Sequence, residues 1–147
     1  MKIPALRMRE KLVVRVVSRT LIPFILLFGL YVQFHGDYGP GGGFQAGVIF
    51  AAAFVLYGLV FGLDLLQRVV SWAMVETGVA IGVLLYGGVG VGSFFLGGNF
   101  LDYKVLDSHD PMHGLHLGLL LIEFGVGLTV FASMLALFYA FAGRRSE

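Results

Sequence analysis

The stretch GLHLGLLLIEFGVGLTVFASMLALFYAFAG, residues 114–143, decides the fold because it holds a single charged residue, Glu123. A helix needs about 20 apolar residues to cross the hydrocarbon core of a bilayer. This stretch is therefore long enough to cross once. At membrane depth no water is present to satisfy backbone polar groups, so an apolar segment is stable there as an α-helix. The stretch predicts a transmembrane helix.

Three similar stretches precede it, at residues 20–34, 38–63 and 69–101, and the only charge in them is Glu76. The composition agrees, with 58% hydrophobic residues, 13% charged residues and a mean hydropathy of +0.88. Ordinary globular domains carry about twice that charged fraction. We predict an all-α membrane protein forming a single domain over residues 1–147. Its four transmembrane helices are expected at about 14–34, 43–62, 72–96 and 112–142.

The basic residues are distributed unequally between the two sides. Four crossings place residues 1–13, the connection after the second helix and the C-terminus on one side. Of the 10 Lys and Arg residues, all but Lys104 fall there or in the first turns of the helix that leaves that side. Basic residues concentrate on the cytoplasmic side of membrane proteins. The pattern predicts cytoplasmic N and C termini and a basic cytoplasmic leader at residues 1–13.

Glu123 is the most conspicuous polar residue, since it is expected about ten residues into the last helix, near the middle of the bilayer. An ionisable group at that depth is costly and is a functional candidate by default, able to take up and release a proton. The alternative is a protonated or paired carboxyl that only ties this helix to a neighbour. Glu76 is expected one turn into the third helix, where an interfacial position explains it equally well.

Histidines gather before and at the start of the last helix, namely His109, His113 and His116, together with Asp110. His113 and His116 are three residues apart and share a helix face, as do His116 and Glu123. Because His titrates near neutral pH, these residues are candidates for proton entry from the outer side. The cluster lacks a recognised metal-ligand spacing. An ordinary outer loop also fits, since proline after Asp110 favours a helix start.

Three consecutive glycines lie at the start of the second helix. They are Gly41, Gly42 and Gly43, and they lie between Pro40 and Phe44. Glycine allows unusual backbone angles and close approach, and proline cannot continue a helix. We expect a tight structural turn here. Pairs of glycines four residues apart predict close helix contacts at Gly43/Gly47, Gly58/Gly62, Gly78/Gly82, Gly88/Gly92 and Gly114/Gly118. The glycine run at residues 87–92 is a place where the third helix could bend or unwind.

The segment PGGGFQAG, residues 40–47, resembles the MrpB (MnhB) subunit family of Mrp-type multisubunit Na⁺/H⁺ antiporters. The segment LIEFGVGLTV, residues 121–130, resembles the last helix of that family, and the resemblance extends over about residues 15–142. It implies a small membrane subunit of a complex that exchanges Na⁺ for H⁺. The expected partners are large antiporter-like subunits and other small membrane subunits. The expected location is the cytoplasmic membrane of a bacterium or archaeon.

The resemblance implies a transport subunit rather than an enzyme, with no cofactor, no metal and no nucleic-acid partner. Glu123, His116, Glu76 and His113 are then the candidates for a proton path. Three alternatives stay open: a purely structural subunit, an equivalent subunit of an Mrp-like membrane-bound hydrogenase or related redox-driven pump, and an independent small exporter. The chain has no cysteine, so it would not itself carry electrons in a redox complex. An exporter of that type has its essential acid in the first helix, where this chain has none.

Overall fold

The computed structural model describes residues 11–36 and 39–143. Within them, four helices are long and apolar enough to cross a membrane: α2 (Leu12–Phe34), α3 (Gly43–Phe61), α5 (Trp72–Phe95) and α6 (Pro111–Gly143). This confirms the expected all-α membrane fold. A short helix, α4 (Leu63–Val69), and a 3-10 turn, η1 (Tyr103–Leu106), were not expected. Most of the basic leader predicted at residues 1–13 lies outside the described residues.

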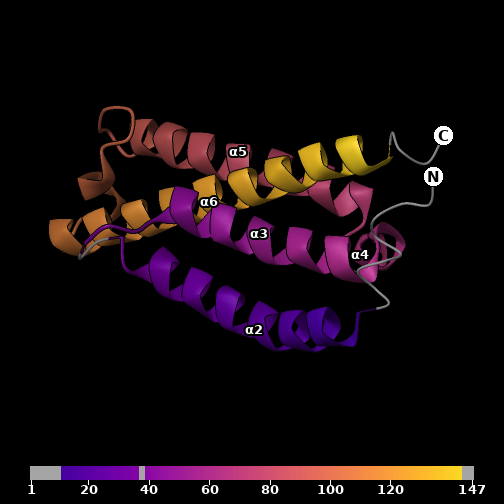
Figure 1. Cartoon of the computed structure of the whole chain (residues 1–147). Coiled ribbons are helices and arrows are strands. Elements are labelled where there is room, and N and C mark those ends of the chain that lie inside the picture. The colour runs from indigo at the N-terminus through magenta and orange to yellow at the C-terminus, as the bar shows by residue number, and fades with distance from the viewer. Residues whose placement is uncertain (1–10, 37–38, 144–147) are drawn as a thin grey trace.

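The long helices form a row rather than a closed bundle (Figure 1). α2 packs on α3, α3 packs on α6, and α6 packs on α5, with little contact between α2 and α6. The α2–α3 turn and the α5–α6 connection lie at one end, which we call the turn end. At the opposite end α4 joins α3 to α5, and we call it the α4 end. α6 therefore lies between two other helices along much of its length.

A small hydrophobic core closes the α4 end. Leu66 of α4 and Leu135 of α6 are both fully buried there, together with Val75 of α5. The hydroxyl of Tyr139 donates a 2.7 Å hydrogen bond to the backbone carbonyl of Val70, which directly follows α4. The Ser71 hydroxyl caps α5 by accepting a bond from the Met74 amide. These contacts fix the connection between the second and third long helices.

Glycines set the distance between neighbouring long helices. A Cβ at Gly47 would lie 2.5 Å from the Gly127 carbonyl oxygen, and one at Gly82 would overlap Thr129. Only glycine allows the backbones to approach this closely. The run at residues 87–92 does not interrupt α5, which stays helical throughout. Nothing lies within 4 Å of a Cβ placed at Gly88 or Gly92, so this pair makes no helix contact within the described chain.

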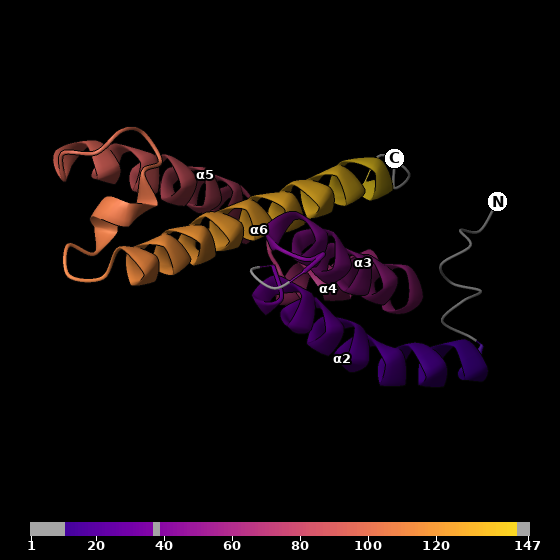
Figure 2. The same cartoon turned by 90° about the vertical axis from the view of Figure 1, so that its left-hand side faces the viewer.

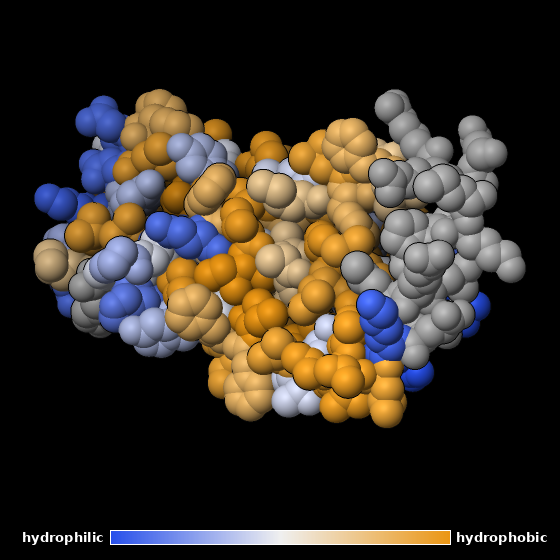
Figure 3. Space-filling model, viewed as in Figure 1, coloured by the Kyte–Doolittle hydropathy of each residue, from blue (hydrophilic) through white to orange (hydrophobic). Residues whose placement is uncertain are grey.

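The outward faces of the long helices are apolar. Large exposed hydrophobic side chains occur on all four, and Figure 3 shows hydrophobic colouring over the middle of the molecule with hydrophilic residues toward its ends. A soluble protein rarely exposes apolar surface on this scale. Such a surface suits contact with lipid tails or with the helices of other membrane subunits.

α6 is much longer than its neighbours. It has 33 residues, which corresponds to about 50 Å, whereas the hydrocarbon core of a bilayer is about 30 Å thick. Its first turns extend past the ends of α2 and α3, alongside the last turns of α5 (Figure 2). There η1 packs on α6, with the Tyr103 ring lying over Gly118. The turn end of the molecule is thus stepped, with α5 and α6 projecting beyond α2 and α3.

Candidate functional site

The turn between α2 and α3 is held by backbone hydrogen bonds. The Gly42 amide donates to the Val32 carbonyl at 3.0 Å, and the Gly39 amide donates to the His35 carbonyl at 3.1 Å. Gly42 has a φ of +109°, a conformation that favours glycine. A Cβ at Gly41 would lie 2.8 Å from the Val32 carbonyl oxygen. Both positions therefore require glycine.

The side chain of Glu123 lies against this turn. A Cβ at Gly36 would overlap the Glu123 carboxylate, and a Cβ at Gly42 would lie 3.0 Å from its Oε1 atom. A Cβ at Gly43 would overlap the backbone carbonyl of Glu123. The carboxylate thus occupies the space that side chains at Gly36 and Gly42 would fill. It is partly buried where α6 crosses the start of α3.

The carboxylate also lies at the N-terminus of α3. The N-cap residue of α3 is Gly42, which has no side chain to accept a bond from the first amides of the helix. The Glu123 carboxylate from α6 lies beside this N-cap residue. Free amides and the aligned helix dipole give this end of α3 a partial positive charge, which interacts favourably with an anion.

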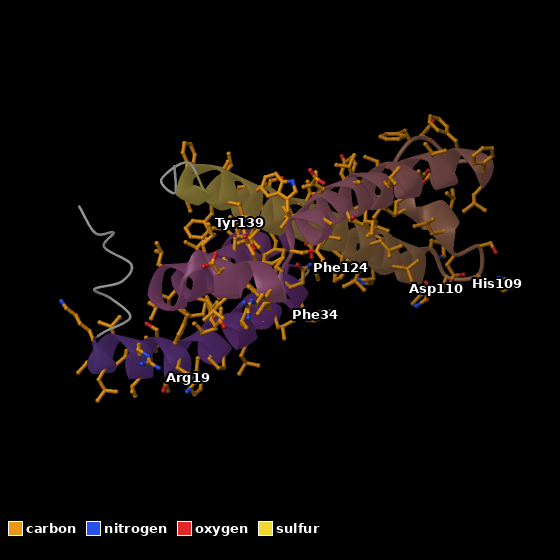
Figure 4. All side chains as sticks on the ribbon, turned by 90° about the vertical axis from the view of Figure 1, so that its right-hand side faces the viewer. Arg19, Phe34, His109, Asp110, Phe124 and Tyr139 are labelled. Carbon is orange, nitrogen blue, oxygen red and sulfur yellow. The ribbon has the colours of Figure 1, made fainter. Side chains whose placement is uncertain are left out.

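The position of Glu123 along the molecule differs from the expected one. It lies level with the turn that ends α2 and starts α3, not midway along those helices. In Figure 4, Phe34 at the end of α2 and Phe124 next to Glu123 appear at a similar level along the helices. The reason is that α6 projects beyond α2 and α3, so its residue count misplaces the level of Glu123 relative to them.

Gln33 is a second polar residue at this site. It is 5% exposed, and a Cβ at Gly127, one turn after Glu123 on α6, would lie 2.9 Å from its Oε1 atom. Its amide nitrogen, Nε2, is buried without a hydrogen-bond partner. A buried polar atom left unpaired is unfavourable and calls for an explanation. The sequence showed Gln33 as the one polar interruption near the end of the first apolar stretch, but not that it would be buried beside α6.

The histidine cluster lies before and at the start of α6, where Asp107 and Asp110 bond its residues, and it does not continue this site. The Asp107 carboxylate accepts bonds from the backbone amides of His109, at 2.9 Å, and Asp110, at 3.2 Å. It also pairs with Nδ1 of His113 at 2.9 Å. These bonds, above all the one from the His109 amide and next the one from His113, hold the pKa of Asp107 below its ordinary value. Asp107 and His113 are six residues apart, a spacing that predicts no contact from the sequence.

Asp110 caps α6 as the proline after it suggested. Its Oδ1 atom accepts bonds from the amides of Met112, at 3.0 Å, and His113, at 3.3 Å, and α6 begins at Pro111. Figure 4 shows His109 and Asp110 together in the loop before α6. Across residues 11–36 and 39–143, no three His, Cys, Asp or Glu side chains are grouped so that they could hold a metal ion.

The four proton-path candidates do not form one cluster. His116 lies seven residues before Glu123 on α6, about 10 Å away along the helix, and is exposed. Glu76 lies in the first turns of α5 and accepts a 2.7 Å hydrogen bond from the Trp72 indole. Gly78 lies two residues after Glu76 and faces Ala132 of α6. Ala132 lies about 14 Å along α6 from Glu123. The structure thus places Glu76 near the α4 end and Glu123 near the turn end.

Comparison with known proteins gives a consistent result. Residues 13–136 match a domain described as related to the MnhB subunit of a Na⁺/H⁺ antiporter. A protein of Staphylococcus haemolyticus, provisionally named antiporter subunit mnhB2, is 31% identical over 136 residues, covering 91% of this chain and 96% of the relative. A protein of the same name from Staphylococcus aureus strain Newman is 30% identical over 138 residues, with the same coverage.

Proposed function

Because this chain belongs to the family of the MnhB subunit of Na⁺/H⁺ antiporters, we propose that it is a small multi-pass subunit of a monovalent cation/proton antiporter complex. Its partners are large antiporter-like subunits and other small membrane subunits. The complex lies in the cytoplasmic membrane, with the α4 end and its arginines toward the cytoplasm. Within the complex, Glu123 borders the path of a proton or cation.

The role proposed for Glu123 rests on its position against the glycine-rich turn between α2 and α3. A carboxylate in an apolar helix is costly unless its environment compensates. Here the N-terminus of α3 supplies favourable dipoles, and Gly36 and Gly42 leave room for the carboxylate. If the residue served only to join helices, a smaller polar side chain and ordinary turn residues would suffice. The arrangement suits an anionic group that attracts a proton or cation to this site.

The chain supplies only part of such a path. On the helix face between His116 and Glu123 lie Leu119 and Leu120, which offer no polar group. Glu76 is at least about 14 Å away along the row of helices. A proton moving across the complex therefore needs water or polar groups from a neighbouring subunit on either side of Glu123. This is why we propose that Glu123 borders a path and does not form one alone.

The test is Glu123→Gln, which keeps the size of the side chain but cannot ionise. In everted membrane vesicles, we expect Na⁺-dependent proton movement to fall by roughly a hundredfold, the lower end of the effect of losing a proton-transfer group. The complex should still assemble on blue-native gels. The matched control is Glu76→Gln, because Glu76 is exposed and bonded to Trp72 near the α4 end. Normal antiport in the Glu123 variant would rule out the proposed role.

A structural role is the second candidate, and the close packing of the glycine turn favours it. The contact of Gly43 with the Glu123 backbone leaves no space for a larger residue. Phe44, in the first turn of α3, is 60% exposed and available to a neighbouring subunit. If this role dominates, Gly42→Leu and Phe44→Ala should abolish assembly on blue-native gels. Intact complexes without transport in these variants would argue against it.

A further inference from the structure

An apolar groove runs between α2 and α3 toward the α4 end. It is lined by Ile22 and Leu26 of α2, by Ala53, Phe54 and Tyr57 of α3, and by Val69 of α4. Its volume is about 130 Å³. Apolar cavities of roughly 150 Å³ hold a benzene-sized group. The groove therefore has room for a short stretch of hydrocarbon chain, and it is open on one side.

Arginines continue this groove toward the α4 end. Arg15, Arg19, Ile22 and Leu26 follow one another at spacings of four, three and four residues, which places all four on one face of α2. Side chains on a helix lean toward its N-terminus, so the two guanidinium groups extend away from the apolar part of the groove. Arg19 is labelled on α2 in Figure 4.

A third arginine comes from a different element. Arg68 of α4 directly precedes Val69, which lines the groove. Arg15, Arg19 and Arg68 are all exposed, and across the described ranges no carboxylate forms an ion pair with any of them. Asp64, one turn before Arg68 on α4, is also exposed and does not pair with it. The three positive charges lie toward one end of the apolar groove.

α2 is curved (Figure 2), and it carries a proline next to the groove residue Ile22. Pro23 lies within α2 and has no amide hydrogen to donate to the carbonyl of Arg19. Figure 2 shows α2 curving along its length. Proline is the usual cause of such a bend. The first turns of α2, which carry Arg15 and Arg19, are mostly exposed.

We propose that this groove binds an anionic phospholipid from the leaflet at the α4 end. One acyl chain lies along Ile22, Leu26 and Phe54, and the phosphate contacts Arg15, Arg19 and Arg68. Measured from Phe34 at the other end of α2, Arg19 lies about 22 Å and Arg15 about 28 Å along the helix. In a hydrocarbon core about 30 Å thick, these arginines reach the headgroup region of that leaflet.

The chemistry favours a lipid over a helix from another subunit. A lipid joins an anionic headgroup to an apolar chain, which matches arginines at one end of a narrow apolar groove. A partner helix would need a carboxylate at the same membrane boundary and would have to enter a groove of only about 130 Å³. The proposal is independent of the transported ion and of the role of Glu123.

The experiment uses the whole complex, with a photoreactive benzoylphenylalanine in place of Leu26. The complex is reconstituted into vesicles of phosphatidylcholine containing about one fifth phosphatidylglycerol, an anionic lipid. After illumination, mass spectrometry identifies the adducts on this chain. We expect phosphatidylglycerol adducts to exceed their share of the vesicle lipid. Arg19→Gln should lower that excess about fivefold. Adding Arg68→Gln to this variant should lower it further.

Two controls make the result specific. The same photoreactive residue at Phe24, which is 64% exposed and does not line the groove, should give adducts in the vesicle ratio. Lys104→Gln, in η1 at the opposite end, should leave the excess at position 26 unchanged. The proposal is overturned if position 26 cross-links to another subunit. It is also overturned if the lipids react there in proportion to the vesicle composition, or if the arginine variants leave the excess intact.

Discussion

Glu123 and Gly36 lie far apart in the sequence, yet the Glu123 carboxylate fills the space that a side chain at Gly36 would occupy. This contact gives a sharp test at the scale of single residues. Gly36→Ala should destabilise the protein by about 1 kcal/mol, because the added methyl group overlaps only the carboxylate end of the flexible Glu123 side chain, which must turn aside. The thermal melting temperature of the tagged chain in mild detergent measures the effect.

The matched experiment combines Gly36→Ala with Glu123→Ala. Removing the carboxylate frees the space for the new methyl group, so the double variant should lose the penalty that Gly36→Ala causes alone. Gly42→Ala should stay destabilised in the Glu123→Ala background, because its φ of +109° is unfavourable for alanine whatever fills the space. Additive effects of Gly36→Ala and Glu123→Ala would show that the two residues do not touch.

Gln33 should show a separation between stability and transport. Its Nε2 atom is buried and unpaired, so Gln33→Met, which keeps the shape of the side chain, should leave stability unchanged or raise it by about 1–2 kcal/mol. If the buried amide serves the site of Glu123, antiport should fall in the same variant. Melting and vesicle assays on one preparation give both quantities. A loss of stability would mean that the amide has a bonding partner within the protein.

At the scale of helices, α5 contains glycines in two different environments. Some pack against α6, and others have no neighbour within the described residues. A Cβ at Gly82 overlaps Thr129 of α6, whereas one at Gly88 meets nothing within 4 Å. Gly82→Leu should therefore lower the melting temperature of the chain by several degrees, and Gly88→Leu should leave it nearly unchanged. If Gly88→Leu instead blocks complex assembly while the chain stays folded, this bare face contacts a neighbouring subunit. Equal melting temperatures for the two variants would contradict the α5–α6 packing.

The four long helices could be predicted from the sequence because each apolar stretch is long enough to cross a membrane. The same patterns missed α4 and η1, which are too short to show a periodic signal. They also did not show which glycine pairs make contacts within the chain. Gly43 and Gly47 face α6 as expected, but Gly88 and Gly92 touch nothing within the described residues, since glycine spacing alone does not say which face meets a neighbour.

The candidate site was predicted in its residue types but not in its geometry. An acidic residue in an apolar stretch indicates a functional site from the sequence alone. Its contact with Gly36 and Gly42 depends on how far α6 projects beyond α3, which only the packed structure shows. The pairing of Asp107 with His113 was missed for a similar reason, since it is made by a loop whose sequence has no regular period.

At the scale of the whole molecule, the chain is a row of four helices with apolar surfaces on both sides. Coupled exchange of two ions needs binding sites for both and a change of access between the two sides of the membrane. One carboxylate at the turn end of an open row of helices suits a contributing subunit better than a complete transporter. The exposed apolar faces are then the surfaces that other subunits and lipids cover.

The most direct test of this account is to identify what binds the chain in its native membrane. A tag at the C-terminus, solubilisation in mild detergent and mass spectrometry of the purified material give the composition. The account predicts two large antiporter-like subunits together with several small membrane subunits. Recovery of hydrogenase-type or iron–sulfur subunits would contradict it by placing the chain in a redox-driven pump. Recovery of this chain alone, repeated after cross-linking, would contradict its role as a subunit.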